Sequence, residues 1–360
     1  MLQRTLRSVL SHRASHQVAP SYAPLLVATT CRSLSSGGAS SRSTLIKELR
    51  AITSAPMKEC VKALKAADDD LEAAVTILRK SGMAAAAKKA GRGATEGAAC
   101  IMHGSDGSAC VVELNSETDF VARNEIFQDL AAAVARTALG LRPSAASSSC
   151  AAADVDMAAL GAAALDGAGM ADADVASAAS VTEGVGIAVS KLGENIVLRR
   201  ACLLTPPTSG GLVCGYVHNA YAKDVGKTAA AVVLESTSTD VAALQELGQK
   251  LAMHIVAATP QFLDRASVDP AALERERAIL LEQATASGKP ENVVQKMVDG
   301  RLNKYFGEVC LVDQTYMIDA DAGSVSKVLK AAGKDLGAEV SIAAFVRYSV
   351  GEGLEAVAED

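Results

Sequence analysis

An internal duplication constrains the fold of this chain more than any other feature of its sequence. When Thr118-Asp119 is placed over Thr239-Asp240, the same offset aligns apolar positions on both sides of the pair. Each copy predicts a strand, a helix start at Thr-Asp and an amphipathic helix, so we expect two α+β subdomains of related topology. The aligned positions are Val111 and Val112 with Val232 and Val233, Leu130 with Leu251, Ala131 with Ala252, and Val134 with Ile255.

Further strands are expected around each copy. A β-like segment that ends in His precedes each duplicated strand, over residues 100–103 and 215–218. Asp106-Gly107 predicts a hairpin turn, because this dipeptide favours the left-handed backbone of two-residue turns. Strand patterns also occur at 194–204 and 340–350.

Residues 43–92 predict a separate unit of three helices. So few residues bury only a small core, so we expect a docking module and not an active-site scaffold. The first helix is expected over 44–52, the second with Pro56 in its first turn, and the third from a capping box of Asp69 and Glu72 to a stop at Gly82.

Composition and pattern predict the remaining boundaries. Residues 97–140 and 186–265 are expected as the two core subdomains, and 307–360 as a return to the core. Residues 141–185, rich in Ala, Ser and Gly, predict a linker or insertion with at most one weak helix. Residues 266–306 predict a helical hairpin of the dimerisation type, which either pairs across a dimer or folds back on one chain. Its seam is expected to contain Leu273, Ile279, Leu280, Val293, Val294 and Met297.

Residues 1–42 have the composition of an organelle transit peptide. No Asp or Glu occurs before Glu48, whereas Arg is frequent and the segment is rich in Ser, Thr and Ala. The run Arg32-Ser33-Leu34-Ser35 predicts cleavage after Leu34. Arg close to the first residue favours the mitochondrial matrix over a plastid, and a merely disordered basic tail is the remaining alternative.

The composition excludes several classes of protein. A net charge of −6 over 360 residues argues against broad electrostatic binding of nucleic acid, and no apolar run predicts a membrane-spanning helix. The eight cysteines include no C-x-x-C pair and are expected to be reduced and mostly buried. The five histidines are scattered, so we expect neither a metal site nor another cofactor.

One motif imitates a phosphate-binding loop. Val225-Gly226-Lys227-Thr228 resembles the end of G-x-x-x-x-G-K-[ST], but the position that requires the first Gly is Tyr221. Residues 229–234 predict a strand where a phosphate loop would open a helix. Because no H-E-x-x-H, G-x-S-x-G or G-x-G-x-x-G occurs either, we expect a protein without covalent chemistry of its own.

The segment NSETDFVARN (115–124) is the strongest candidate for a binding site. A strand leads into a capped helix, and Phe120 falls in the first turn of that helix. Phe120 either packs on its own core or stands exposed as an anchor for a partner's pocket. The second copy has Val241 at this position, so the fold does not require an aromatic residue there, which favours the exposed anchor.

Several segments in the same order resemble the elongation factor Ts family, the nucleotide-exchange factors of elongation factor Tu. The resemblance implies an α+β fold: an N-terminal three-helix domain like the ubiquitin-associated domain, then a duplicated α+β core with an inserted helical hairpin. The matching segments are LIKELRAITSAPMKECVKALKAADDDLEAAVTILRKSG (45–82), ELNSETDFVA (113–122), LGENIVLRR (192–200), AMHIVAATPQFL (252–263), GKPENVVQKMVDGRLNKYFGEVCL (288–311) and VRYSVGEGLE (346–355).

The resemblance also implies roles for residues of the core. In the family, the Asp-Phe pair of T-D-F-V-A intrudes near the partner's switch region and magnesium site. The matching residues are Asp119 and Phe120, flanked by Thr118 and Val121. A histidine that contacts the GTPase domain matches His218.

The N-terminal unit resembles the part of the family that makes a second contact. Its matching residues are Arg50 and Met57, but the next position, often a second Met in relatives, is Lys58 here. The chain also stops at Asp360, without the extra C-terminal helix of many bacterial members.

The implied function is guanine-nucleotide exchange on GDP-bound elongation factor Tu during organellar translation elongation, without direct contact to nucleic acid or membrane. The alternative is a module that binds ubiquitin-like partners through residues 43–92 and has no exchange activity. A homodimer through 270–304 is a further expectation.

Overall fold

The computed structural model describes residues 42–53, 55, 57–141, 151–286 and 290–354. Within them the expected α+β class is confirmed: helices pack on a seven-stranded sheet in which all adjacent strands are antiparallel. The path through the sheet is β3 (Ala152–Asp154), β4 (Ile196–Leu204), β2 (Ala109–Ser116), β1 (Glu96–His103), β6 (Val225–Ser236) and β5 (Gly211–Ala222), and β7 (Val340–Ser349) also pairs with β6. The expected transit peptide and its cleavage site lie outside the described residues.

The duplication is confirmed and extends further than the sequence pattern indicated. Each copy is a β-hairpin followed by helix and a third strand that returns beside the second strand of the hairpin. The aligned apolar residues of both copies are fully buried. The first copy contains β1 (Glu96–His103), β2 (Ala109–Ser116), α4 (Asp119–Ala122), α5 (Glu125–Gly140) and β4 (Ile196–Leu204); the second contains β5 (Gly211–Ala222), β6 (Val225–Ser236), α9 (Val241–Ala258) and β7 (Val340–Ser349).

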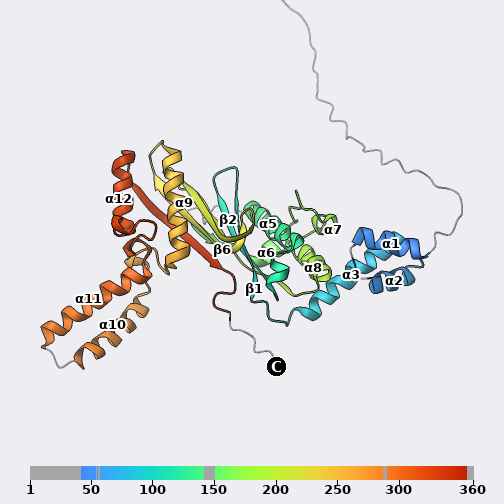
Figure 1. The fold of residues 1–360 in the computed structure, drawn as a ribbon, viewed down its shortest axis with the longest axis horizontal. Coiled ribbons are helices and arrows are strands. Elements are labelled where there is room, and N and C mark those ends of the chain that lie inside the picture. The colour runs from blue at the N-terminus through green and yellow to red at the C-terminus, as the bar shows by residue number, and fades with distance from the viewer. Residues whose placement is uncertain (1–41, 54, 56, 142–150, 287–289, 355–360) are drawn as a thin grey trace, which may run out of the picture. The chain divides into compact units, whose positions relative to one another are not determined.

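The two copies join through a short stretch of backbone pairing. Ala99 and Cys100 of β1 pair with Gly226 and Val225, the first residues of β6. The helices of the two copies lie on opposite sides of the strands, with α5 against β1 and β2 and α9 against β5 and β6 (Figure 1). Between the two copies, small and apolar side chains of their strands pack on each other, which explains how the strands are buried on both faces.

The N-terminal unit has the three expected helices, α1 (Arg42–Thr53), α2 (Met57–Ala66) and α3 (Leu71–Lys89). Two details differ from the prediction. The third helix does not stop at Gly82, because that residue is buried where α3 crosses α8 (Val181–Leu192), and a Cβ there would lie 3.0 Å from Ser190 Cβ. The helix is capped by Asp70, whose Oδ1 accepts the Ala73 N–H at 2.8 Å, whereas Asp69 pairs with Arg42. Pro56 lies outside the described residues.

The segment expected as a linker is folded where the structure describes it, from residue 151 onward. Aspartate and serine caps begin its short helices, and its few large side chains, such as Leu160 and Val175, are fully buried beside α5. The small residues permit close packing: a Cβ at Gly184 would lie 2.8 Å from the side chain of Leu165. The elements are β3 (Ala152–Asp154), α6 (Met157–Ala162), α7 (Ala173–Ala176) and α8.

The helical hairpin is present as α10 (Pro270–Thr285) and α11 (Glu291–Val309), which pack on each other within one chain. Leu280, Val294 and Met297 lie in its seam as expected. Ile279 and Val293 do not, because their side chains are 50% and 37% exposed. Pairing of this hairpin with a second copy stays a prediction. The chain returns to the sheet through 3₁₀ turns at Arg265–Ser267, Leu311–Asp313 and Ala320–Ala322 and through α12 (Val325–Leu336).

A buried histidine ties α9 to the loop before α12. The backbone N–H of Met317 donates to Nδ1 of His254 at 3.1 Å, and Nε2 of His254 lies 3.0 Å from Oε1 of Gln314. The Gln314 amide nitrogen donates to the backbone oxygens of Ala258 and Glu308, so its oxygen accepts from His254. The imidazole is therefore neutral with its proton on Nε2, and burial lowers the pKa of His254.

We expect the free energy of unfolding to fall as the pH drops below about 6.5, the ordinary histidine pKa. Since the folded pKa of His254 is lower, the unfolded chain binds this proton first. His254→Gln keeps a donor and an acceptor but cannot titrate, so its unfolding should depend less on pH, by up to about 1.4 kcal/mol per pH unit. Urea unfolding of both proteins at several pH values between 7 and 5 measures the difference; equal pH dependence would contradict the expectation.

Candidate functional site

The candidate site begins where β2 ends and α4 starts. Thr118 has extended backbone angles and caps α4, since its Oγ1 accepts the Val121 N–H at 3.5 Å. Asp119 is therefore the first residue of the helix and not its cap. In the second copy the corresponding cap is Asp240, which accepts the Ala243 N–H at 3.0 Å. The two copies thus begin their helices one residue apart.

A second loop, between α8 and β4, holds this helix start in place. Both oxygens of the Glu194 carboxylate accept from Thr118, one from its N–H at 2.9 Å and the other from its hydroxyl at 2.6 Å. In return, the Glu117 carboxylate accepts the backbone N–H of Asn195 at 2.6 Å. Hydrogen bonds to a carboxylate are stronger than neutral ones, so this reciprocal pair fixes the backbone that presents the next residues.

Phe120 is exposed, as the anchor interpretation predicted. Its side chain is 82% accessible, whereas Val121 and Ala122 turn into the core of the first copy. The interpretation that Phe120 packs on its own core is therefore wrong. Val241 is also exposed, at 62%, so both copies turn this position of the helix away from the core.

The α4 helix faces the tip of the β5–β6 hairpin across a groove of about 300 Å³. Asp119 and Arg123 line the groove from one side, and Asn219, Tyr221 and Lys227 line it from the other. The Arg123 guanidinium lies over the Tyr221 ring, 4.9 Å from its centroid, and Arg123 Nε is 3.6 Å from Asp119 Oδ2.

His218 lies on the same hairpin, next to Asn219 in sequence. Its side chain is exposed, and its Nδ1 is 3.2 Å from the Tyr216 hydroxyl. The structure therefore brings the hairpin that carries His218 against the helix that carries Asp119 and Phe120. The sequence predicts Asp119, Phe120 and His218 separately, and the structure places α4 and the β5–β6 hairpin, which carry them, on the two sides of one groove.

The two predicted residues of the N-terminal unit lie apart from this groove. Arg50 is exposed on α1, and Met57, 60% exposed, is the first residue of α2. Lys58 is exposed beside Met57. Their side chains offer a separate surface on the three-helix unit.

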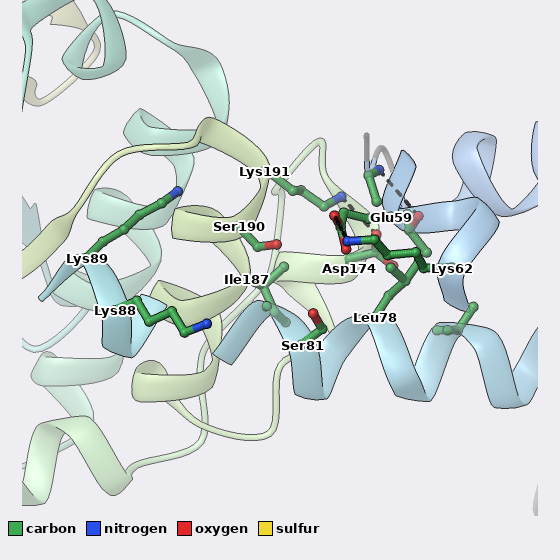
Figure 2. A pocket seen from close by; sticks show the side chains of 14 residues that line it. Glu59, Lys62, Leu78, Ser81, Lys88, Lys89, Asp174, Ile187, Ser190 and Lys191 are labelled. Carbon is green, nitrogen blue, oxygen red and sulfur yellow. Dashed lines mark hydrogen bonds and ion pairs between the residues drawn. The ribbon is translucent and has the colours of Figure 1, made fainter. Parts of the chain in front are cut away.

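A larger pocket, of about 430 Å³, lies between the three-helix unit and helices α7 and α8. Figure 2 shows Glu59 and Lys62 of α2 on one side of it and Asp174 and Lys191 on the other. Four of its charged side chains form two ion pairs: Lys62 lies 3.0 Å from Glu59, and Lys191 lies 2.8 Å from Asp174. This pocket is a joint between packed helices and holds no evident reactive group.

Burial lowers the reactivity of the described cysteines. The six described cysteines are unpaired and buried, as predicted, and burial raises the thiol pKa to about 12 at Cys100, Cys202 and Cys214. A thiol that stays protonated is a poor nucleophile. Among the described residues, no group of three or more His, Cys, Asp or Glu is placed to hold a metal ion. Within the same residues, no helix is long and apolar enough to span a membrane.

The sequence does not indicate the contacts that three residues make at this site: Glu194, Arg123 and Tyr221. Glu194 lies in the LGENIVLRR segment, so the resemblance marked its segment but not its contact with Thr118. In the sequence, Tyr221 stands out only as the residue that breaks the phosphate-loop pattern. Nothing in the order of the residues indicated that its ring would lie under Arg123.

Comparisons with known proteins agree with these observations. A sequence model of the family described as "Elongation factor TS" matches residues 117–352. The chain is 44% identical over 316 residues to a protein of Rhodospirillum centenum named Elongation factor Ts, which covers 88% of this chain and 94% of that protein. A protein of the same name from Paramagnetospirillum magneticum is 46% identical over 317 residues, covering 88% of this chain and 93% of that protein. The family match includes the Thr118 helix start, the Glu194 loop and the β5–β6 hairpin, and on this evidence the chain belongs to the elongation factor Ts family.

Proposed function

We propose that this protein is a guanine-nucleotide exchange factor that promotes release of GDP from elongation factor Tu. The observation that carries the proposal is Phe120, an aromatic side chain held 82% exposed at a braced helix start within a chain of this family. The protein performs no covalent chemistry and needs no cofactor in this proposal, and any hydrolysis of GTP belongs to the partner.

Exchange requires that binding of the factor to the partner weakens the binding of GDP, and that binding of GDP weakens the binding of the factor. By linkage, a factor that weakens GDP binding is itself weakened by GDP to the same degree. Burial of one Phe side chain is worth about 1.5–3 kcal/mol, which corresponds to about tenfold to a hundredfold in an equilibrium constant. Insertion of Phe120 near the partner's switch region and magnesium site would supply coupling of this size.

The bracing of the helix start favours this insertion. Because Glu194 and Thr118 already hold the backbone before Phe120, little conformational freedom is lost when the ring is buried in a partner. Asp119, beside the ring, would place a negative charge near the partner's magnesium ion. Val121 and Thr118 act in this proposal by holding the turn, since one is packed in the core and the other caps the helix.

Two further surfaces complete the proposed contact. His218 would touch the GTPase domain from the hairpin that faces α4, and Arg50 and Met57 would touch it from the three-helix unit. Lys58 beside Met57 is exposed and charged, so we expect the apolar part of that second contact to be small.

We also propose that the protein acts in the mitochondrial matrix after cleavage behind Leu34, with the plastid as the alternative. The basis is the acid-free, Arg-containing sequence that precedes Glu48. N-terminal sequencing of the protein recovered from fractionated organelles tests both parts, because it reports the compartment and the first residue together.

Phe120→Ala should leave the fold intact, since the side chain is exposed, and should slow the factor-dependent release of GDP by about tenfold to a hundredfold. Stopped-flow release of a fluorescent GDP analogue from elongation factor Tu measures the rate. Val241→Ala is the matched control, because it removes the exposed side chain at the same position of the second copy. An unchanged rate with normal complex formation by Phe120→Ala would sink the proposal.

His218→Ala should slow GDP release less than Phe120→Ala does, because an imidazole offers less apolar area to a partner than a phenyl ring. The same stopped-flow measurement ranks the two variants. His103→Ala, at the exposed end of β1 in the first copy, is the control. A larger loss in His218→Ala than in Phe120→Ala would reverse the assignment of Phe120 as the main anchor.

A further inference from the structure

We propose that Arg123 and Tyr221 form a clamp that holds the Phe120 helix and the His218 hairpin at a fixed spacing, so that both meet the partner as one rigid surface. The inference rests on the proposed exchange function. Arg123 and Tyr221 are positioning residues in it: they act through Phe120 and His218 and need not touch the partner.

A β-bulge turns the side chain of Tyr221 toward the first copy. Along the β5–β6 hairpin, Ala220 pairs with Gly226 and Ala222 pairs with Val225, so Tyr221 is an extra residue on the β5 side. Such a bulge bends its strand and redirects the side chain of the extra residue. Tyr221 accordingly packs, half-buried, against the hydrophobic core of the first copy although it belongs to the second.

Arg123 completes the connection from the other side. It is the C-cap residue of α4, and its backbone N–H donates to Asp119 O at 3.1 Å. Its guanidinium lies over the Tyr221 ring at 4.9 Å and its Nε lies 3.6 Å from the Asp119 carboxylate. One side chain therefore contacts both the residue before Phe120 and the hairpin that carries His218.

The clamp adds to a small number of polar contacts that join the two copies at this end, among them an ion pair between Lys227 Nζ and Glu96 Oε2 at 3.5 Å. The backbone pairing of β1 with β6 covers only Ala99 and Cys100, and one more hydrogen bond runs from the Ile101 N–H to Asp224 O at 3.0 Å. Two contact points held at fixed spacing bind as one unit, whereas loosely joined ones lose freedom when they bind. An exposed cation–π contact is weak, so loss of the clamp should slow exchange by about twofold to fivefold.

The test is a double-mutant cycle on the rate of GDP release at saturating factor. Arg123→Met removes the charge at similar length, and Tyr221→Leu removes the ring. We expect each single variant to be slower by about twofold to fivefold and the double variant to be no slower than one single variant, because both remove the same contact. Tyr221→Phe keeps the ring and should release GDP at the unaltered rate.

Thermal unfolding of each variant accompanies the rates, because Tyr221→Leu also removes core contacts. An unchanged melting temperature in Arg123→Met, whose side chain is exposed, shows that its rate loss does not come from loss of the fold. Rate losses that add in the double variant, or a loss in Arg123→Met with none in Tyr221→Leu, would overturn the clamp and make Arg123 a direct contact. If Phe120→Ala were slow while both single variants were unaltered, the clamp would fail and the exchange function would stand.

Discussion

A single buried carboxylate joins the first copy to the end of the second. Glu113 in the middle of β2 has no exposed surface, and it accepts from Arg199 at 2.9 Å and Arg200 at 2.6 Å on β4. It also accepts the backbone N–H of Gly351 at 3.0 Å, from the turn that follows β7. An unpaired buried charge would cost several kcal/mol, so the third strand of the first copy and the end of the second must both be in place. The sheet that carries the site depends on this arrangement.

The duplicated core explains how one fold presents a binding residue without distortion. Both copies turn a first-turn apolar side chain outward, as Phe120 and Val241. The copies differ in what surrounds that residue: in the first copy α4 ends at its cap Arg123 and α5 begins after its own cap, Asn124, whereas α9 runs without a break from Val241. The break between α4 and α5 leaves a short, separately braced α4 beside the hairpin, and this is where the proposed partner contact lies.

Much of the fold was predictable because its signals are local. The strands, the Asp106-Gly107 turn and the amphipathic repeat helices depend on residues close in sequence, and all were found. The predictions that failed share a cause: the role of a small residue depends on what packs against it in the folded chain. Gly82 predicts a helix stop by its propensity, yet here its missing side chain allows α3 to cross α8 at Ser190. Residues 141–185 look like a linker by composition, but in the described part, from residue 151 onward, small residues between Asp and Ser caps pack as tightly as large ones.

The sequence by itself determined the two hairpin–helix repeats, the helix start at Thr118 and the outward position of Phe120, since each follows from periodicity, a cap and the comparison of two copies. Only the tertiary structure decided which distant groups support that residue. Glu194 reaches Thr118 across the α8–β4 loop, and Tyr221 reaches Arg123 because of a bulge in another repeat. Such contacts depend on strand register and on the orientation of individual side chains. Neither is encoded by any short stretch of residues.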